Sequence, residues 1–284
     1  MIPRRCFCKC STLDLPLVCS YWELDFRFPN LPSEEDLEDI FEDVWVYAKL
    51  AVEGLCQYLV GNRHNIFDKS AYVNRFCPRT HFLHPDHKDY AITAGLFHVF
   101  LKDFEVESFG TTSEPPTAAG QRPEDAEVRA VRSYLYFEYG IMSTDLDYIE
   151  WLRARLVKFG ELFDISLPHM ASDASIADVS TMLHDVGGPD LVLHIPEVAV
   201  ACWKLQALAF AFGEPVVRLN VGEGDKFLKS HMVPVVDPED EEEPELESQE
   251  DGELAQSVSF VVCPGFRFPR GPVIHAEVYI QGGQ

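Results

Sequence analysis

Apolar residues recur at three- and four-residue steps through two long stretches of the chain, and this spacing is the strongest constraint on the fold. The first stretch runs from about Glu34 to Val60 and ends at a stop formed by Gly61 and Asn62. Ser33 stands where a helix N-cap is expected, and the acidic residues after it suit the positive end of a helix dipole. The second stretch is Asp89–Glu107. The chain is therefore predicted to be mainly helical.

Further helices are predicted in the middle of the chain from the same periodicity. One begins at about Glu124, and the next is capped by Ser143 and runs through Phe159. Two more cover Ser172–Val186 and Pro196–Phe212, because a proline fits the first turn of a helix and Gly213 fits its end. Together these segments define a helical core of about residues 34–212.

The composition changes after this helical core to short runs rich in β-branched residues, which are typical of strands. Residues 21–28 alternate apolar and charged side chains, the pattern of a strand with one buried face. We predict an α+β fold, predominantly α-helical, with a small antiparallel sheet from the C-terminal region that the N-terminal strand could join. The C-terminal runs are Val216–Val217, Val233–Val236, Val258–Cys263 and Val273–Ile280.

Two segments lack the apolar residues that a core requires. Residues 108–123 are rich in Gly, Pro, Ser and Thr, and we predict a flexible loop there. Residues 237–253 hold eleven carboxylates and no basic residue, so repulsion between like charges predicts a disordered acidic insert. A single globular domain is expected to comprise 21–236 and 254–284.

Most of the eight cysteines are isolated within hydrophobic runs, as Cys56 and Cys202 are, which predicts buried thiols rather than a disulfide framework. The exception is the segment 1–20, which we expect to be flexible. Three of its cysteines alternate along the chain, and they fit a reactive or simply reduced tail better than a metal site, since no fourth ligand lies nearby. They are Cys6, Cys8 and Cys10.

The formal net charge of −24, from 47 acidic and 23 basic residues, gives a surface that repels phosphate backbones and anionic lipid headgroups. Binding to nucleic acid or to a membrane is therefore not expected. No uninterrupted apolar stretch is long enough to span a bilayer. The apolar patch Leu13–Val18 is interrupted by Asp14 and Pro16 and makes a poor secretory signal. We expect a cytoplasmic or nuclear protein that is not secreted.

The C-terminal third carries the segments Val258–Phe266 (VSFVVCPGF) and Val273–Val278 (VIHAEV) after the acidic insert. A helical body followed by these segments resembles uncharacterised, mostly helical proteins of filamentous fungi. The resemblance implies the architecture described above. Because that family has no established activity, the resemblance implies no function.

One cluster of side chains has the donors that zinc prefers, thiolate and imidazole, within eleven residues. This spacing raises the hypothesis of a site for zinc or another divalent metal. The alternative is a surface loop with solvated histidines, because Pro78 and Pro85 restrict a short segment that would have to wrap the ion alone. The four residues are Cys77, His81, His84 and His87.

The doublet His184 and Asp185 resembles the metal-binding His-Asp pair of HD-type metal-dependent phosphohydrolases, in which a metal ion activates water. That resemblance implies a catalytic role for both residues, together with an upstream His and a downstream Asp that this chain does not place in a matching context. The alternative is that both residues lie in the last turn of a helix that Gly187 and Gly188 terminate.

The segment Ala51–Val60 resembles the helix with which ubiquitin-ligase substrate adaptors bind the elongin B–C complex, where a Leu and a Cys four residues later face the partner. Here Val52 replaces the Leu and Cys56 matches the Cys. The alternative is that Cys56 and Leu59 belong to the hydrophobic core.

These patterns leave two classes of function, since the chain has no G-x-S-x-G nucleophile motif and no complete nucleotide-binding loop. The favoured hypothesis is a non-catalytic protein-interaction or scaffold protein with an acidic surface, in which 237–253 attracts a basic partner. The alternatives are a metal-dependent phosphohydrolase that uses His184 and Asp185 and a ubiquitin-ligase substrate adaptor.

Overall fold

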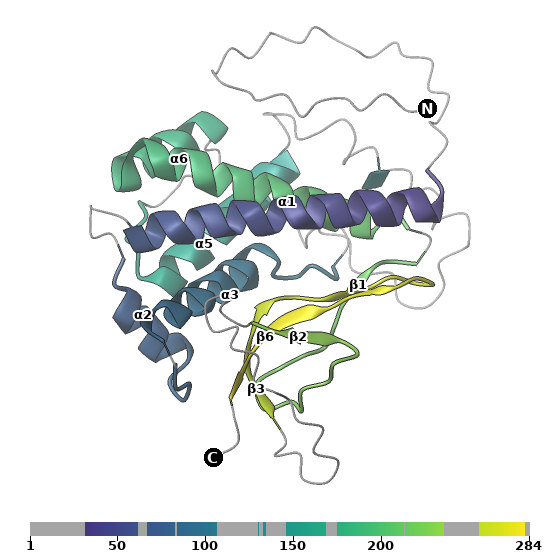
Figure 1. Cartoon of the computed structure of the whole chain (residues 1–284). Coiled ribbons are helices and arrows are strands. Elements are labelled where there is room, and N and C mark those ends of the chain that lie inside the picture. The colour runs from purple at the N-terminus through teal and green to yellow at the C-terminus, as the bar shows by residue number, and fades with distance from the viewer. Residues whose placement is uncertain are drawn as a thin grey trace, which may run out of the picture. The chain divides into compact units, whose positions relative to one another are not determined.

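Helix α1 (Glu34–Gly61) runs along the helical part of the molecule in this computed structural model (Figure 1). Its N-terminus is capped by Ser33, whose Oγ accepts a hydrogen bond from the backbone N–H of Asp36 at 3.1 Å. The predicted helix over 34–60 is confirmed. Its buried side recurs at steps of three and four residues, as the periodicity predicts, but Leu50, which the same pattern places on the apolar side, is 60% exposed. The buried residues include Leu37, Phe41, Trp45, Ala48, Val52, Leu55 and Leu59.

The structure describes nine segments of the chain, and all of them belong to the unit Leu31–Gln284. The N-terminal strand at 21–28, the tail 1–20, the loop 108–123 and the acidic insert 237–253 lie outside the described residues, as do most of the helix predicted from Glu124 and the cap at Ser143. The described segments are 32–61, 67–82, 84–106, 130, 133–134, 146–168, 175–212, 214–235 and 256–281.

Three short elements follow α1: α2 (Lys69–Phe76), the 3₁₀ turn η1 (Pro85–His87) and α3 (Lys88–Phe100). The sequence pattern predicted a helix from 89 to 107, but α3 ends at Phe100. Asp103 has a left-handed backbone conformation with φ of 55°, which ends the regular helix.

Helix α5 (Leu146–Phe163) overlaps the helix predicted from Ser143 to Phe159 and continues past it, and α6 (Ile176–Ala209) joins two predicted helices. The two halves of α6 are separated at Gly188, whose φ of 75° and ψ of −169° interrupt the helix. The predicted stop at this glycine is confirmed. The predicted start of the second half at Pro196 is wrong, because Pro189 follows the break and takes the place in the first turn where a missing N–H costs nothing.

Within the described part of the chain, six short strands form two three-stranded sheets, in the orders β1-β4-β5 and β2-β6-β3. The C-terminal strands were predicted, but the sheet is not wholly antiparallel, because β2 runs parallel to the central strand β6. Pro234 lies in the edge strand β2, where a missing N–H is tolerated. The strands are β1 (Val217–Arg218), β2 (Met232–Pro234), β3 (Ser257–Cys263), β4 (Phe266–Arg267), β5 (Val273–Ile274) and β6 (Ala276–Gln281).

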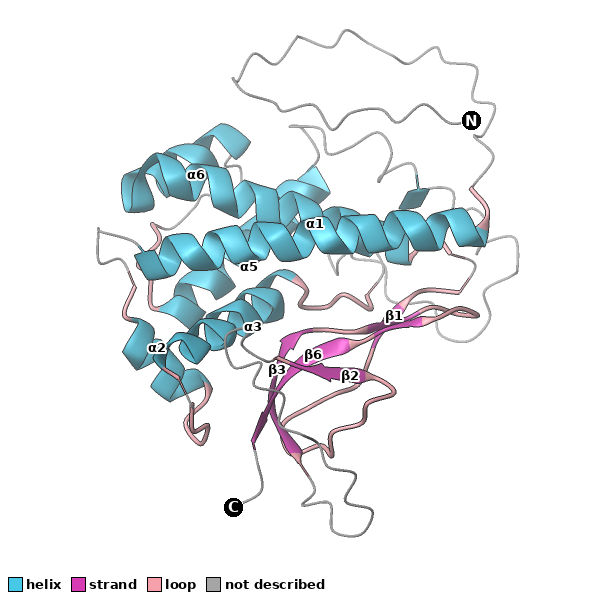
Figure 2. Cartoon of the chain, in the orientation of Figure 1, coloured by secondary structure: helices cyan, strands magenta, loops and turns pink. Residues whose placement is uncertain are grey.

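The helices lie on one side of the described unit and the sheets on the other, so the fold is α+β and mostly helical, as predicted (Figure 2). Aromatic side chains join the two sides. The ring of Phe41 in α1 makes edge contacts with Phe266 and Phe268 at centroid distances of 5.3 Å, and Trp45 contacts Phe97 of α3 at 5.1 Å. The sheets are therefore fixed against α1 and α3, and the grooves of the molecule form where these elements meet.

Among the described helices, α6 is long and apolar enough to cross a membrane by length and composition, with a mean hydropathy of 1.3 over its most apolar window. Within that window 61% of the residues are buried inside the protein. The side chains of Leu191, Ile195 and Cys202 are fully buried in the hydrophobic core. In this structure α6 packs as a core helix.

Candidate functional site

Two grooves lie on either side of α3, and Phe97 lines both. The first groove, of about 530 Å³, lies between the α2–α3 region and the sheets. The second groove, of about 730 Å³, lies between α1, α3 and the strands β3 and β6. These two grooves are the candidate sites.

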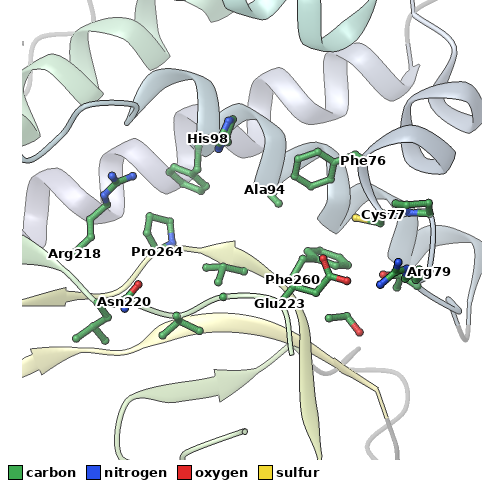
Figure 3. A pocket seen from close by; sticks show the side chains of 18 of the residues that line it. Phe76, Cys77, Arg79, Ala94, His98, Arg218, Asn220, Glu223, Phe260 and Pro264 are labelled. Atoms are coloured by element: carbon green, nitrogen blue, oxygen red, sulfur yellow. The ribbon is translucent and has the colours of Figure 1, made fainter. Parts of the chain in front are cut away.

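Helix and strand residues face each other across the first groove (Figure 3). Phe76, Ala94 and His98 come from α2 and α3, while Phe260 and Pro264 lie opposite them. Apolar and polar side chains thus share the lining, and His98 and Glu223 lie between its two ends. Arg218 and Asn220 lie toward one end, and Cys77 and Arg79 toward the other.

An ion pair joins the two sides of the first groove. Arg218 of β1 donates to both carboxylate oxygens of Glu105, at 2.5 Å from Nε and 2.7 Å from Nη2. Burial opposes the ionisation of Glu105, but the hydrogen bond and the charge of Arg218 outweigh it and lower the pKa of this carboxyl. Glu105 therefore remains ionised and bound to Arg218 at neutral pH.

Gln206 of α6 holds the turn that presents Glu105. Its side-chain amide, which is 2% exposed, donates to the backbone carbonyls of Asp103, Phe104 and Val106 at 2.9 to 3.1 Å. Buried Arg155 of α5 donates to the carbonyl of Lys102 at 2.5 Å. Past the end of α3, the side chains of Gln206 and Arg155 donate hydrogen bonds to these carbonyls in place of the backbone N–H groups of a continuing helix.

Burial favours the neutral forms of His98 and Cys77 in the first groove. Burial lowers the pKa of His98, and the nearby positive charges of Arg218 and Lys102 lower it further. Burial raises the pKa of the Cys77 thiol to about 12, although a hydrogen bond from Thr80 opposes this shift. A thiol with such a pKa carries almost no thiolate at neutral pH, so Cys77 is not an activated nucleophile.

The second groove has one wall formed by the exposed side of α1 from Val46 to Gly61. Val46 and Leu50 are 51% and 60% exposed, an unusual exposure for two apolar side chains one helical turn apart. The opposite walls come from η1, α3, β3 and β6. An ion pair of 3.0 Å between Lys49 of α1 and Glu277 of β6 joins two of these walls.

The charges around the second groove are unbalanced. Its lining includes four carboxylates but a single ammonium, that of Lys49, which Glu277 already binds. Asp89 pairs with Lys69 of α2. The remaining carboxylates, Glu53 and Asp86, are exposed. The second groove therefore presents a negative potential to solvent.

The two thiols that line the second groove are protonated as well. Burial raises the pKa of Cys56 to about 11, and its Sγ contacts the backbone carbonyl of Asp89 at 3.6 Å. Burial, followed by the charge of Glu277, raises the pKa of Cys263 well above its usual value. Neither groove thus contains an activated thiol among its described residues.

The structure does not bring the four predicted zinc ligands together. Cys77 follows α2 and lines the first groove, whereas His87 is buried under α3 with its Nδ1 3.1 Å from the Tyr279 hydroxyl. The expectation that all these histidines are solvated is wrong for His87, because η1 turns it toward β6. His81 and His84 are exposed. Within the described ranges, no group of three or more His, Cys, Asp and Glu side chains is placed to hold a metal.

His184 and Asp185 lie on the exposed side of the first half of α6, with side chains 64% and 72% exposed. His184 Nδ1 and Asp185 Oδ1 are 3.9 Å apart. Neither residue lines the two grooves. The segment ends at the Gly188 break, as the helix-end interpretation predicted, and the phosphohydrolase hypothesis stays a prediction.

The side of the adaptor-like segment that carries Val52, Cys56 and Leu59 faces the interior. Val52 is fully buried, and Cys56 and Leu59 belong to the same hydrophobic core. The core interpretation of Cys56 and Leu59 is confirmed. Because α3 and α6 pack against this side of α1, the side chains that an adaptor would offer to its partner contact this chain itself.

Several residues that define the grooves carried no signal in the sequence. Glu105 and Arg218 are 113 positions apart, and Lys49 and Glu277 are 228 apart. In the sequence each of these four residues resembles an ordinary surface charge. Only the fold brings Lys49 of α1 next to Glu277 of β6, and Glu105 of the 101–106 turn next to Arg218 of β1.

Comparison of the chain with protein-family models, with curated proteins and with solved structures finds no match.

Proposed function

We propose that this chain is a non-catalytic interaction or scaffold protein that binds a basic protein partner through an acidic surface. The observation that carries the proposal is the charge of α1, which holds eight carboxylates and one ammonium. Most of these carboxylates are exposed and fall within the first ten residues of the helix: Glu34, Glu35, Asp36, Asp39, Glu42 and Asp43. We call these six residues the acidic face of α1.

The acidic face has no matching positive charge on α1 itself, so its carboxylates repel one another. Partial burial raises the pKa of the neighbouring Glu38, and the charges of Glu34 and Glu42 raise it further. A basic partner would relieve this repulsion on binding. Opposite charges also accelerate encounter between the partners and exclude acidic competitors.

The state of the described thiols supports a non-catalytic role. Burial raises the pKa of Cys56, Cys77, Cys202 and Cys263, so each is a thiol rather than a thiolate at neutral pH. We expect iodoacetamide at about pH 7.5 to label these four residues only after unfolding, as measured by peptide mass spectrometry. Rapid labelling of any one of them in the native protein would contradict this prediction and point to an activated cysteine.

The proposal is tested with a lysine-rich peptide and the same peptide with its lysines acetylated, which removes the charge and keeps the sequence. Fluorescence anisotropy should show binding of the unmodified peptide that weakens as salt rises, and little binding of the acetylated one. The variant Asp39→Asn, Glu42→Gln, Asp43→Asn should bind more weakly. The control variant Glu150→Gln, Asp185→Asn, Asp190→Asn removes the same charge from α5 and α6.

The two triple variants distinguish binding at the acidic face of α1 from attraction by the overall negative charge of the protein. If both triple variants lose the same affinity, the acidic face has no special role. If the acetylated peptide binds as well as the unmodified one at every salt concentration, the proposed function fails. Deletion of 237–253 measures how much the acidic insert contributes to the affinity for the lysine-rich peptide. Unchanged affinity after the deletion would remove that segment from the proposal.

A further inference from the structure

We propose that the second groove is the docking site for an amphipathic basic helix of the partner. This inference rests on the proposed function and makes it specific, because it assigns a position, a secondary structure and an apolar contact to the basic partner. The occupant is a helix that turns an apolar stripe toward α1 and carries Lys or Arg on the flanks of that stripe.

The shape of the groove fits a helix. The wall from Val46 to Gly61 follows α1 for about 22 Å at 1.5 Å per residue, which is four turns. Val46, Leu50, Glu53 and Gln57 follow one another along α1 at steps of four, three and four residues, so they form a single ridge. Such a ridge packs against the grooves of a second helix laid beside it.

The ridge exposes apolar surface that this chain leaves uncovered. Leu50 is 60% exposed and Val46 is 51% exposed at one end of the groove, and Val60 is 38% exposed at the other. Val262 of β3 and Thr93 of α3 line the space beside the ridge. An apolar side chain entering between them would bury its own surface together with that of Leu50, which favours binding.

The charges decide which helix fits. Glu53 lies on the ridge and Asp86 on the opposite wall, and both are exposed, while Lys49 is held by Glu277 at 3.0 Å. A Lys or Arg on either flank of the docked helix would thus meet a carboxylate. An acidic helix of the same apolar pattern would meet like charges on both sides and be rejected.

The test uses two synthetic peptides of identical leucine and lysine composition and about 14 residues, the length that covers four turns. In one, leucines recur at i, i+4, i+7 and i+11, and in the other their order is scrambled so that no apolar stripe forms. Binding to the full chain is measured by fluorescence anisotropy. We expect the periodic peptide to bind about tenfold more tightly than the scrambled one.

Single substitutions on the two sides of the groove locate the binding. Leu50→Asn should weaken the periodic peptide about tenfold, and Glu53→Lys should weaken both peptides. The chain offers matched controls in Leu193→Asn, since Leu193 of α6 is 62% exposed, and in Glu150→Lys, since Glu150 of α5 is exposed. Neither control should change the affinity. Circular dichroism of each variant checks that the fold is retained.

Different results would contradict the groove inference and the proposed function. Equal affinity for the periodic and scrambled peptides, or equal effects of Leu50→Asn and Leu193→Asn, would overturn the groove inference and leave an acidic surface that binds basic partners. Absence of binding by both lysine-containing peptides at low salt would overturn the proposed function as well. A second copy of this chain as the occupant would show as a dimer that Leu50→Asn dissociates, and that result would also overturn the inference.

Discussion

In the first groove Arg218 and Glu105 bind each other at 2.5 and 2.7 Å. In the second groove Glu277 binds Lys49 and Asp89 binds Lys69, while the two other carboxylates of the lining, Glu53 and Asp86, are exposed to solvent. Both grooves use Phe97 of α3 as a wall. They therefore belong to one scaffold and differ mainly in how their charges are satisfied. An ion pair across a groove tends to hold its two sides together, while an excess of negative charge attracts positively charged molecules from solution.

The two grooves also differ in the contacts that hold their walls in place. The turn that carries Glu105 is tied to α6 by Gln206 and to α5 by Arg155, so the first groove depends on a network of buried polar contacts. The ridge of the second groove is a regular helix surface that needs no such network. Substitutions in the first groove should thus change stability, and substitutions in the second should change binding.

The largest stability effect is expected for Gln206→Leu. This change leaves the carbonyls of Asp103, Phe104 and Val106 without their side-chain donor in a buried region. We expect a loss of about 3 kcal/mol in the free energy of unfolding, measured by chemical denaturation. Gln57→Leu on the exposed side of α1 is the control and should change stability by less than about 0.5 kcal/mol. Similar values for the two variants would show that the turn does not depend on Gln206.

A smaller effect is expected when the Glu105–Arg218 pair is removed. The side chains of Arg218 and Glu105 are 31% and 41% exposed, so solvent screens their charges. A double-mutant cycle of Glu105→Gln and Arg218→Leu should therefore give a coupling of about 0.5 to 1 kcal/mol. The Arg218→Leu change also removes a positive charge that lowers the pKa of His98. NMR titration should therefore show the His98 pKa rising in this variant, and an unmoved pKa would separate His98 from the pair.

The sequence was sufficient for the parts of the fold that depend on local patterns. The periodicity of α1, the break at Gly188 and the β-branched runs after Gly213 all act within a few residues, and their predicted positions agree with the structure. The parallel pairing of β2 with β6 could not be predicted in this way, because it joins residues 44 positions apart, such as Met232 and Ala276.

The grooves were missed for a related physical reason. Metal and catalytic motifs are recognised from residues close together in the sequence. The sequence therefore predicted candidate sites at Cys77, His81, His84 and His87 and at the His184–Asp185 doublet. The residues that define the grooves come from distant segments, as Lys49 and Glu277 do. The acidity of the composition is the basis for proposing a basic partner, whereas the proposed docking position depends on the exposure of Leu50 and Val46, which only the structure shows.

The smallest effect is expected for Glu38→Gln, which tests the repulsion within α1. The Glu38 carboxylate packs against Gly271, so burial raises its pKa, and the neighbouring carboxylates raise it further. Because the pKa of Glu38 is higher in the folded chain than in the unfolded chain, its contribution to stability is present at low pH and lost as pH rises through the folded pKa.

Glu38→Gln removes a charge that disfavours folding at neutral pH, so the melting temperature should rise slightly at pH 7. The difference from the unmodified chain should shrink as pH falls below the usual glutamate value of about 4.3, where Glu38 is protonated. Glu150→Gln, at an exposed position of α5, is the control and should show no such pH dependence. If a basic peptide relieves the same repulsion, its presence should reduce the gain from Glu38→Gln at pH 7. An unchanged gain would mean that the bound peptide lies away from the acidic face of α1.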